Sequence, residues 1–342
     1  MKKGLSLILL FLIFAVDAQD IHYTQIQQTP MLVNPSYAGM FQGWERVSVQ
    51  HKSQWVNTGT KFHTTSIAAD MNFFKPKRGN KAHLGVGLQL YNDIGGDSKF
   101  GTKQMLLNLS GIVPIGEMQT IAGGLQFGIG QRTGDLTQLY FSNQFNGSEF
   151  DPDLPSLENN NLVSFVYSDL GVGVSYRFGN HKIGFARDDA TDFRLGVSYL
   201  HLNTPELKYR LGFKEDLYAK LAINASFTKD VSGSPLGFKI LFNQFVQGPH
   251  TESLFGGLLR YRLSSGSKTT GLIRDAYLSG GLYYRLNDAI SPAVFVQLSS
   301  FNFGITYDIT LSQLSQVTRA GGLEFSLVYT NMDFALFKRR RM

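Results

Sequence analysis

Residues Asp169–Phe178 read DLGVGVSYRF, and this stretch decides the fold class of the chain. Apolar or aromatic side chains occupy every second position from Leu170 to Phe178, and glycine, serine or arginine fills the positions between them. Successive side chains of a strand point to opposite faces, so the segment has one apolar face and one small or polar face. A helical period of 3.6 residues would not separate these residues in this way. The stretch is therefore predicted to be a β-strand.

The same period of two recurs along most of the 342-residue chain. It predicts strands over Glu45–Trp55, Phe62–Phe74, Ala82–Ile94, Gln104–Ile115, Thr120–Gln131, Tyr167–Phe178, Asp192–Leu202, Leu217–Thr228, Leu236–Gln247, Glu252–Leu263, Arg274–Leu286, Ala289–Ser299, Phe301–Ile309 and Gly321–Thr330. An even number of such strands is typical of single-chain outer-membrane barrels. The expected fold class is all-β, a transmembrane outer-membrane β-barrel of about 14 antiparallel strands.

The composition agrees with a membrane barrel and excludes several other classes of protein. Charged residues make up 17% of the chain, whereas an ordinary soluble domain carries about 25%. A soluble β-sandwich is the alternative, because it would also alternate, but its exposed face would carry more charge. The absence of cysteine excludes disulfides and thiolate metal sites. The net charge of +6 is modest and scattered, which argues against a nucleic-acid partner.

The first 18 residues read as a secretory signal peptide. Lys2 and Lys3 give a positive start, Leu5–Val16 is an apolar core, and Ala18 ends a small-residue cleavage site. The alternative is an uncleaved membrane anchor, but the apolar run is shorter than the ~20 residues that a spanning helix needs. The chain is thus divided into a signal peptide (1–18), an N-terminal arm (19–43), a barrel (44–331) and a basic tail (332–342).

The lengths of the connections predict the orientation of the barrel. If the N-terminus is periplasmic, the longest connection, Arg132–Val166, faces outside and the tight Gly116–Gln119 faces the periplasm. Outer-membrane barrels have short periplasmic turns and longer external loops. We therefore expect an outer-membrane protein of a Gram-negative bacterium with both termini periplasmic, in contact with outer-membrane lipid.

Charge divides between the two predicted sides. The predicted inner connections and the tail are basic, with Lys75, Lys77, Arg78 and Lys81 in one turn and Lys338–Arg341 at the end. The outer loop has acids but no lysine or arginine between Thr133 and Leu162. One interpretation is an ordinary solvated surface. The other is a basic periplasmic collar for an anionic partner or phosphate, together with an acidic outer loop that could hold divalent cations.

No pattern in the chain predicts catalysis. None of the seven histidines forms an HExxH or another close metal pair, and neither a GxSxG elbow nor a Walker loop occurs. We therefore expect no enzymatic activity, no cofactor and no metal site. Arg177, Arg194 and Arg285 are predicted to face the lumen, where they either select anions or pair with acids.

The N-terminal arm carries the most specific motif. It begins Gln19-Asp20 and continues with Tyr23-Thr24-Gln25 and with the hexamer Asn34-Pro35-Ser36-Tyr37-Ala38-Gly39. In this opening, and in its glycine-rich strands, the chain resembles the PorP/SprF family of type IX secretion outer-membrane proteins of Bacteroidota. One departure is Val56, where many members have a basic residue after Gln-Trp.

The resemblance implies a role in protein secretion or gliding motility. Partners would be a secreted protein or a cell-surface adhesin, through its C-terminal domain, and periplasmic components of the secretion or gliding machine. The candidate partner-binding residues are Asn34, Pro35, Tyr37, Gly39, Lys75, Lys77, Arg78 and Lys81. The alternatives are a passive porin or solute channel and a structural outer-membrane protein without transport.

The arm itself is expected to be ordered against the barrel, at the periplasmic mouth or inside the lumen. Its prolines restrict the backbone, and Tyr23, Ile26, Met31 and Tyr37 are too apolar for a free tail. Asn34 precedes a proline, which favours an extended conformation there. The arm is predicted to be either a structural plug or an element that docks a partner.

Overall fold

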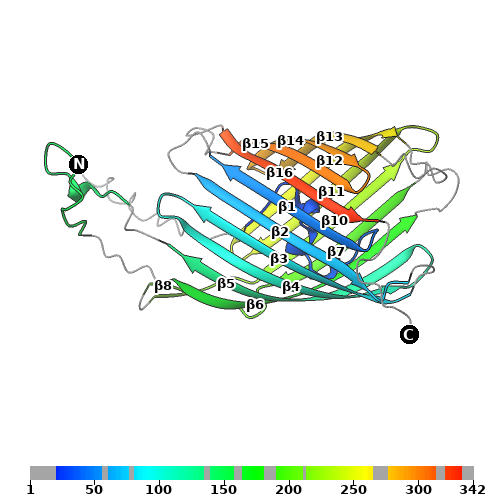
Figure 1. Ribbon diagram of the computed structural model, residues 1–342, viewed down its shortest axis with the longest axis horizontal. Coiled ribbons are helices and arrows are strands. Elements are labelled where there is room, and N and C mark those ends of the chain that lie inside the picture. Colours follow the sequence, from blue (N-terminus) through cyan, green and yellow to red (C-terminus); the bar gives the residue numbers. More distant parts are fainter. Residues whose placement is uncertain are drawn as a thin grey trace, which may run out of the picture.

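Fourteen strands close into one antiparallel barrel in the computed structural model of the chain (Figure 1). The structure describes residues 21–55, 61–76, 81–134, 139–157, 164–180, 190–210, 213–264, 276–312 and 320–332. The barrel strands are β1 (Glu45–Gln54), β2 (Phe62–Phe73), β3 (His83–Gly95), β4 (Phe100–Pro114), β5 (Gln119–Thr133), β6 (Phe165–Asn180), β7 (Thr191–Leu200), β10 (Lys220–Asp230), β11 (Leu236–Gln247), β12 (His250–Ser264), β13 (Ala276–Arg285), β14 (Ala289–Leu298), β15 (Phe301–Thr310) and β16 (Ala320–Asn331). The predicted all-β barrel of 14 strands is confirmed.

Each strand pairs with its neighbours in the chain, and the first strand closes the barrel by pairing with the last. Glu45 of β1 lies opposite Asn331 of β16, and Gln54 lies opposite Gly322. Closure leaves no strand edge with unpaired N–H and C=O groups, which a membrane would not tolerate.

The barrel is apolar outside, and its inner face carries most of the polar side chains. Val174 of β6 is 62% exposed and points outward, whereas the next residue, Ser175, is 6% exposed and points into the lumen. The other strands repeat this pattern, with exposed Ile67, Leu107 and Phe127 on the outside. A soluble sandwich would bury the apolar face, so the arrangement is that of a barrel solvated by lipid.

Two features of the barrel were not expected from the sequence. A two-stranded sheet, β8 (Glu206–Arg210) with β9 (Phe213–Asp216), lies within the connection from β7 to β10. Strand β4 begins at Phe100, four residues before its predicted start. Residues 100–103 show no apolar alternation, but they pair with 92–95 of β3 across a short turn.

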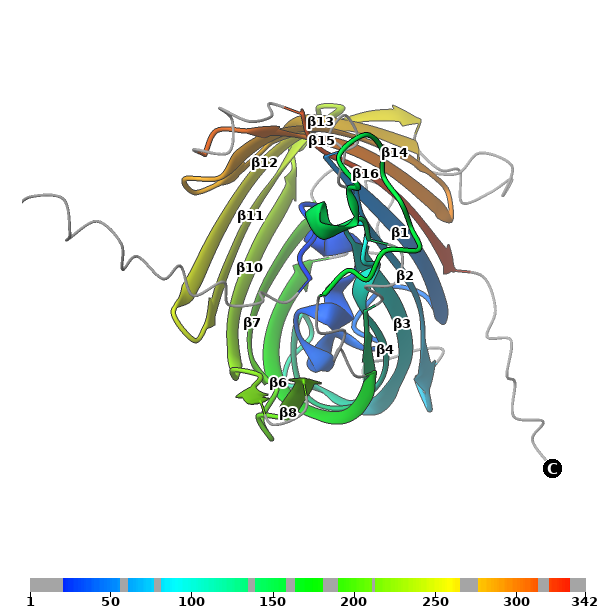
Figure 2. The same cartoon turned by 90° about the vertical axis from the view of Figure 1, so that its left-hand side faces the viewer.

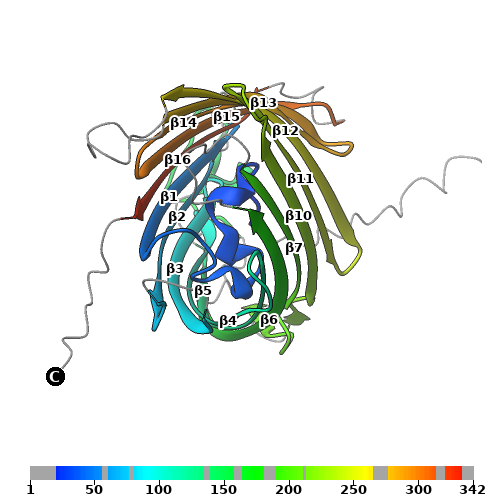
Figure 3. The same ribbon diagram turned by 90° about the vertical axis from the view of Figure 1, so that its right-hand side faces the viewer.

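The two mouths of the barrel differ in the connections that they carry. We call the end with the connection from β5 to β6 the long-loop mouth, and the opposite end, where the chain enters β1, the Trp44 mouth (Figures 2 and 3). The connection at the long-loop mouth covers residues 134–164, whereas the turn between β4 and β5 at the Trp44 mouth covers 115–118.

The N-terminal arm lies inside the lumen, where both end views show it as the blue segment (Figures 2 and 3). It contains three short 3₁₀ helices, η1 (Ile26–Gln28), η2 (Pro30–Leu32) and η3 (Pro35–Tyr37), and another, η4 (Ser142–Gln144), lies in the long connection. In the described part of the chain, no helix is long and apolar enough to cross a membrane.

The arm crosses the lumen from one mouth to the other. Its first described residues contact Glu324 and Asp308, near the ends of β16 and β15 at the long-loop mouth. At the other end, the backbone of Trp44 pairs with Asn331 at the Trp44 mouth. The two ends of the described chain therefore lie at opposite mouths, and the termini themselves, whose side the sequence predicted, lie outside the described residues.

Several sequence predictions lie outside the described residues. These are the signal peptide, Lys77 and Arg78 of the basic turn, residues 135–138 and 158–163 of the acidic loop, and the tail beyond Met332.

The outward direction of Val174 leads to a prediction about assembly. We expect Val174→Arg to lower the fraction of folded barrel, because a charge near the bilayer midplane costs roughly 2–4 kcal/mol. Val174→Leu is the matched control and should fold normally. Heat-modifiable migration on gels after folding into lipid vesicles measures the folded fraction. Equal folding of the two variants would contradict the lipid-facing assignment.

Candidate functional site in the barrel lumen

A buried cluster of charges anchors the start of the arm. The Glu324 carboxylate accepts hydrogen bonds from the backbone N–H groups of Thr24 (2.8 Å) and Gln25 (3.0 Å). Lys52 lies between Glu324 and Asp308, with Nζ 3.3 and 3.5 Å from their carboxylate oxygens. Lys52 and Glu324 are 1% and 0% exposed. Removing one partner from a buried cluster of this kind leaves an uncompensated charge, so the cluster is a strong constraint on the arm.

Arg285 extends this cluster across the lumen. Its guanidinium donates to the hydroxyl of Thr24 at 2.7 Å and pairs with Asp288 at 2.9 Å. Weaker ion pairs reach Asp308 at 3.6 Å and Glu252 at 3.8 Å. The start of the arm is thus tied to β1, β13, β15 and β16 by charge-assisted hydrogen bonds and ion pairs, the hydrogen bonds being about twice as strong as neutral ones.

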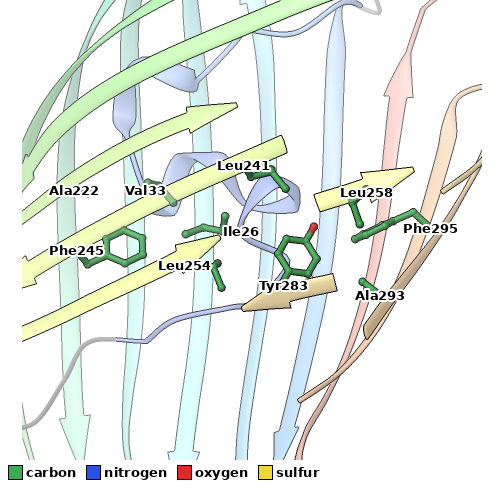
Figure 4. Packing of buried hydrophobic residues seen from close by; sticks show 10 residues of the cluster. All are labelled: Ile26, Val33, Ala222, Leu241, Phe245, Leu254, Leu258, Tyr283, Ala293 and Phe295. Carbon is green, nitrogen blue, oxygen red and sulfur yellow. The ribbon is translucent and has the colours of Figure 1, made fainter. Parts of the chain in front are cut away.

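The middle of the arm is held by apolar packing. Ile26 and Val33 of the arm join a buried cluster with residues of β10 to β14 (Figure 4). The cluster consists of Ile26, Val33, Ala222, Leu241, Phe245, Leu254, Leu258, Tyr283, Ala293 and Phe295. Because this side of the lumen is apolar where the arm touches it, the two surfaces exclude water from each other.

The hexamer Asn34–Gly39 forms the tightest contact between arm and wall. Asn34 is extended and caps η3, because its side-chain oxygen accepts from the N–H of Ser36 at 3.0 Å. Its amide nitrogen donates to the carbonyls of Val174 (3.1 Å) and Val197 (3.2 Å) in the wall. The amide oxygen of Asn34 therefore fixes the turn, and its amide nitrogen holds the turn against the wall.

Three further contacts fix the remainder of the hexamer. The hydroxyl of Ser36 lies 2.7 Å from that of Ser175, and the amide of Asn224 donates to the Tyr37 hydroxyl at 2.9 Å. Gly39 adopts φ +72°, a conformation that strains other residues, and its N–H donates to Asp70 at 2.8 Å.

Glycines in the wall make room for this hexamer. A Cβ at Gly124 would overlap the backbone of Pro35 and Ser36, and one at Gly173 would overlap the side chain of Asn34. A Cβ at Gly85 would overlap the carbonyl of Ala38. All three positions face the lumen. The inward glycines of the alternating strands thus form a cradle that lets the arm approach the wall closely.

The end of the arm is anchored at the Trp44 mouth. Arg46 forms a bidentate pair with Asp70 at 2.7 and 2.8 Å and stacks 4.5 Å over the ring of Phe41. The Lys75 ammonium donates to the carbonyls of Phe41 (3.2 Å) and Gly43 (2.8 Å). Burial lowers the pKa of Lys75 to about 8, because the charged form loses hydration.

These contacts separate the candidate residues of the basic turn. The Lys75 ammonium is hydrogen-bonded to the arm, whereas Lys81 is exposed at the surface of the Trp44 mouth. The predicted residues Asn34, Pro35 and Tyr37 are buried where the arm contacts the wall of the lumen. The structure therefore does not bring the hexamer and the exposed turn into one surface.

No metal site is visible within the described ranges, where no three histidine, aspartate or glutamate side chains come close enough to hold an ion. A hollow of about 80 Å³ lies beside the arm's first anchor, with Trp55, Asp288 and Asp308 among its lining residues. It is large enough for a few waters.

Comparison with known proteins places this architecture in a family. The model of the family described as "Type IX secretion system membrane protein PorP/SprF" matches residues 15–329, which include both the arm and the barrel. This chain belongs to the PorP/SprF family. A search of the curated proteins found no match.

Several solved outer-membrane barrels are similar to this PorP/SprF protein at low identity. The CymD monoaromatic hydrocarbon channel is 10% identical, with 90% of this chain and 93% of that chain covered and a TM-score of 0.44. The translocator domain of the autotransporter NalP from Neisseria meningitidis is 11% identical, with 89% and 93% covered and a TM-score of 0.39. BamA from Haemophilus ducreyi lacking POTRA domains 1–3 is 7% identical, with 84% and 70% covered and a TM-score of 0.43.

Sequence reasoning missed the residues of this PorP/SprF protein that receive the arm. Asp308 and Glu324 are the only charged residues of β15 and β16, and Lys52 occupies an inward position of β1. A charge at such a position needs a partner inside the lumen. This signal could have singled out the three residues, but it could not have named Thr24 and Gln25 as their partners.

The cradle leads to a prediction with a matched pair of variants. We expect Gly124→Ala to loosen the arm, because overpacking costs typically 1–3 kcal/mol and the new methyl group meets backbone. Gly123→Ala is the control, since no atom lies within 4 Å of a Cβ there. Limited proteolysis of purified barrel should cut the arm faster only in Gly124→Ala. Equal cleavage of both variants would mean that Gly124 does not hold the arm.

Proposed function

We propose that this protein is an outer-membrane component of the type IX secretion or gliding apparatus that works by binding other proteins. Its partners are a secreted protein or adhesin, through a C-terminal domain, and components of the periplasmic machine. Family membership supports the secretion role. The observation that carries the binding role is the arm, which occupies the lumen and is hydrogen-bonded to the wall through Thr24, Asn34 and Gly39.

The plugged lumen argues against the alternative of a passive porin. Porins with an aqueous channel have about 16–18 strands, and a narrower barrel leaves less room. In this barrel the arm also crosses that space and is anchored at each mouth by buried charges. Solutes would have to displace these contacts in order to pass.

In this proposal the Trp44 mouth faces the periplasm and the long-loop mouth faces outside, after removal of the signal peptide. The short turn at 115–118 and the long connection at 134–164 support this orientation. The exposed basic turn would then meet the machine, and the acidic connection would meet the cargo. The protein needs no catalytic group or cofactor for this role.

Conductance distinguishes the binding role from the porin role. We expect the purified protein to show little ion conductance in planar bilayers, because the arm crosses the lumen and is anchored at each mouth. A variant that lacks residues 21–43 should conduct, provided that it keeps the heat-modifiable migration of a folded barrel. Steady conductance of the intact protein, with uptake of a small solute lost in a deletion strain that secretes normally, would favour the porin.

Partner capture tests the protein-binding role. Neutralising Lys77, Arg78 and Lys81 should reduce the periplasmic proteins recovered with the barrel from mild-detergent outer membranes, and higher salt should have the same effect. Lys75 is left unchanged because it holds the arm. Neutralising Lys61 and Lys99, at the long-loop mouth, is the control. If mass spectrometry finds the same amounts of periplasmic proteins with both variants, this result would contradict a partner that binds at the basic turn.

A further inference from the structure

Five cationic side chains gather on the inside of the barrel at the Trp44 mouth. Arg177 of β6, Arg194 of β7, Lys239 of β11, and Arg260 and Arg262 of β12 all occupy inward positions near the ends of their strands. Strands β6, β7, β10, β11 and β12 are consecutive neighbours in the wall (Figure 3). We call these five residues the lumenal basic cluster. It is separate from the exposed turn that contains Lys81.

Two carboxylates among the described residues pair with the cluster. Asp192 accepts from Arg177 at 2.5 and 2.8 Å and from Arg194 at 2.7 Å. Asp230 pairs with Arg260 at 2.7 Å and lies 3.9 Å from Arg262. Among the described residues, this group therefore has an excess of basic side chains over carboxylates. The excess is concentrated in a lumen, where surrounding low-dielectric walls strengthen its field.

Within the lumenal basic cluster, Lys239 is the residue that most directly indicates a ligand. Its side chain is half-buried, and its ammonium group makes no hydrogen bond or ion pair with any described residue. Its electrostatic neighbours are two cations, Arg194 and Arg260, and a single acid, Asp192. Placing an ammonium group beside two guanidinium groups is unfavourable unless an anion joins them.

The geometry of the cluster suits oxyanions. Arg260 and Arg262 lie 4.5 and 5.9 Å from the ring of Tyr277, which holds their planar groups in place. Guanidinium groups held in this way present N–H donors that match carboxylate oxygens. Arg194 remains 30% exposed despite its bond to Asp192, so it is accessible from the mouth.

The extent of the cluster indicates an elongated ligand. Neighbouring strands lie about 4.8 Å apart, so four spacings from β6 to β12 span roughly 19 Å. This length exceeds a single phosphate or carboxylate and equals about six residues of extended chain. The lumen of this barrel already holds one irregular peptide, the arm. We propose that the lumenal basic cluster binds an extended acidic peptide segment of a partner protein, which enters through the Trp44 mouth.

Peptide binding to the purified, folded barrel in mild detergent tests this site without any secretion assay. A fluorescent hexaglutamate peptide should bind, hexaglutamine should not, and higher salt should weaken the binding. We expect Lys239→Gln to weaken binding about tenfold, the size of one lost charge-assisted hydrogen bond, and Lys239→Glu to weaken it further. Lys229→Gln is the matched control, because Lys229 lies near the same mouth on the outward face of β10.

The outcomes separate this site from the proposed function. Equal affinity of the wild type and both Lys239 variants would overturn the proposal, even if capture of periplasmic proteins still depended on Lys77, Arg78 and Lys81. Complete displacement of hexaglutamate by inorganic phosphate at similar concentration would also overturn it, in favour of a single-oxyanion site. Heat-modifiable migration of each variant confirms that the barrel is folded.

Discussion

The structure depends on one constraint: the polar groups of the arm must find hydrogen-bond partners inside a membrane barrel. The arm forms three short 3₁₀ helices, whose turns pair only part of its backbone groups with one another. An unpaired buried N–H or C=O group costs about 1–3 kcal/mol. The wall therefore supplies acceptors and donors at fixed positions. The Glu324 carboxylate accepts hydrogen bonds from the N–H groups of Thr24 and Gln25, and the hydroxyl of Ser110 donates to the carbonyl of Ala38.

This constraint explains why the inner face of the barrel carries both charges and glycines. Charges are placed where the arm begins and ends, and glycines lie where its backbone comes nearest to the wall. A larger residue at Gly85, Gly124 or Gly173 would push the hexamer away from its hydrogen-bond partners. The hexamer Asn34–Gly39 thus forms one side of an interface, and residues of several strands form the other side.

The lumen is also electrically asymmetric. At the long-loop mouth, Lys52 and Arg285 face four carboxylates, namely Glu252, Asp288, Asp308 and Glu324. At the Trp44 mouth, the lumenal basic cluster has more cations than described acids. Such a field attracts anionic groups to one mouth and cationic groups to the other.

The sequence by itself determined the local structure of this protein. A period of two places Val174 and Ser175 on opposite faces whatever the strand's neighbours are, and its recurrence along the chain predicted the number of strands. It also showed that the arm is too apolar to be free and that Asn34 is extended. These properties follow from backbone geometry and from the chemistry of adjacent residues.

Only the tertiary structure decided where the arm lies and what it touches. Thr24 meets Glu324, and Asn34 meets Val197, across 300 and 163 positions of the chain. Lys75 belongs to the arm's anchor and Lys81 to the surface, although both lie in one basic turn. The lumenal basic cluster likewise brings together residues of four strands, β6, β7, β11 and β12. Closure of the barrel creates all these contacts, and no local pattern encodes which inward residues will face each other across the lumen.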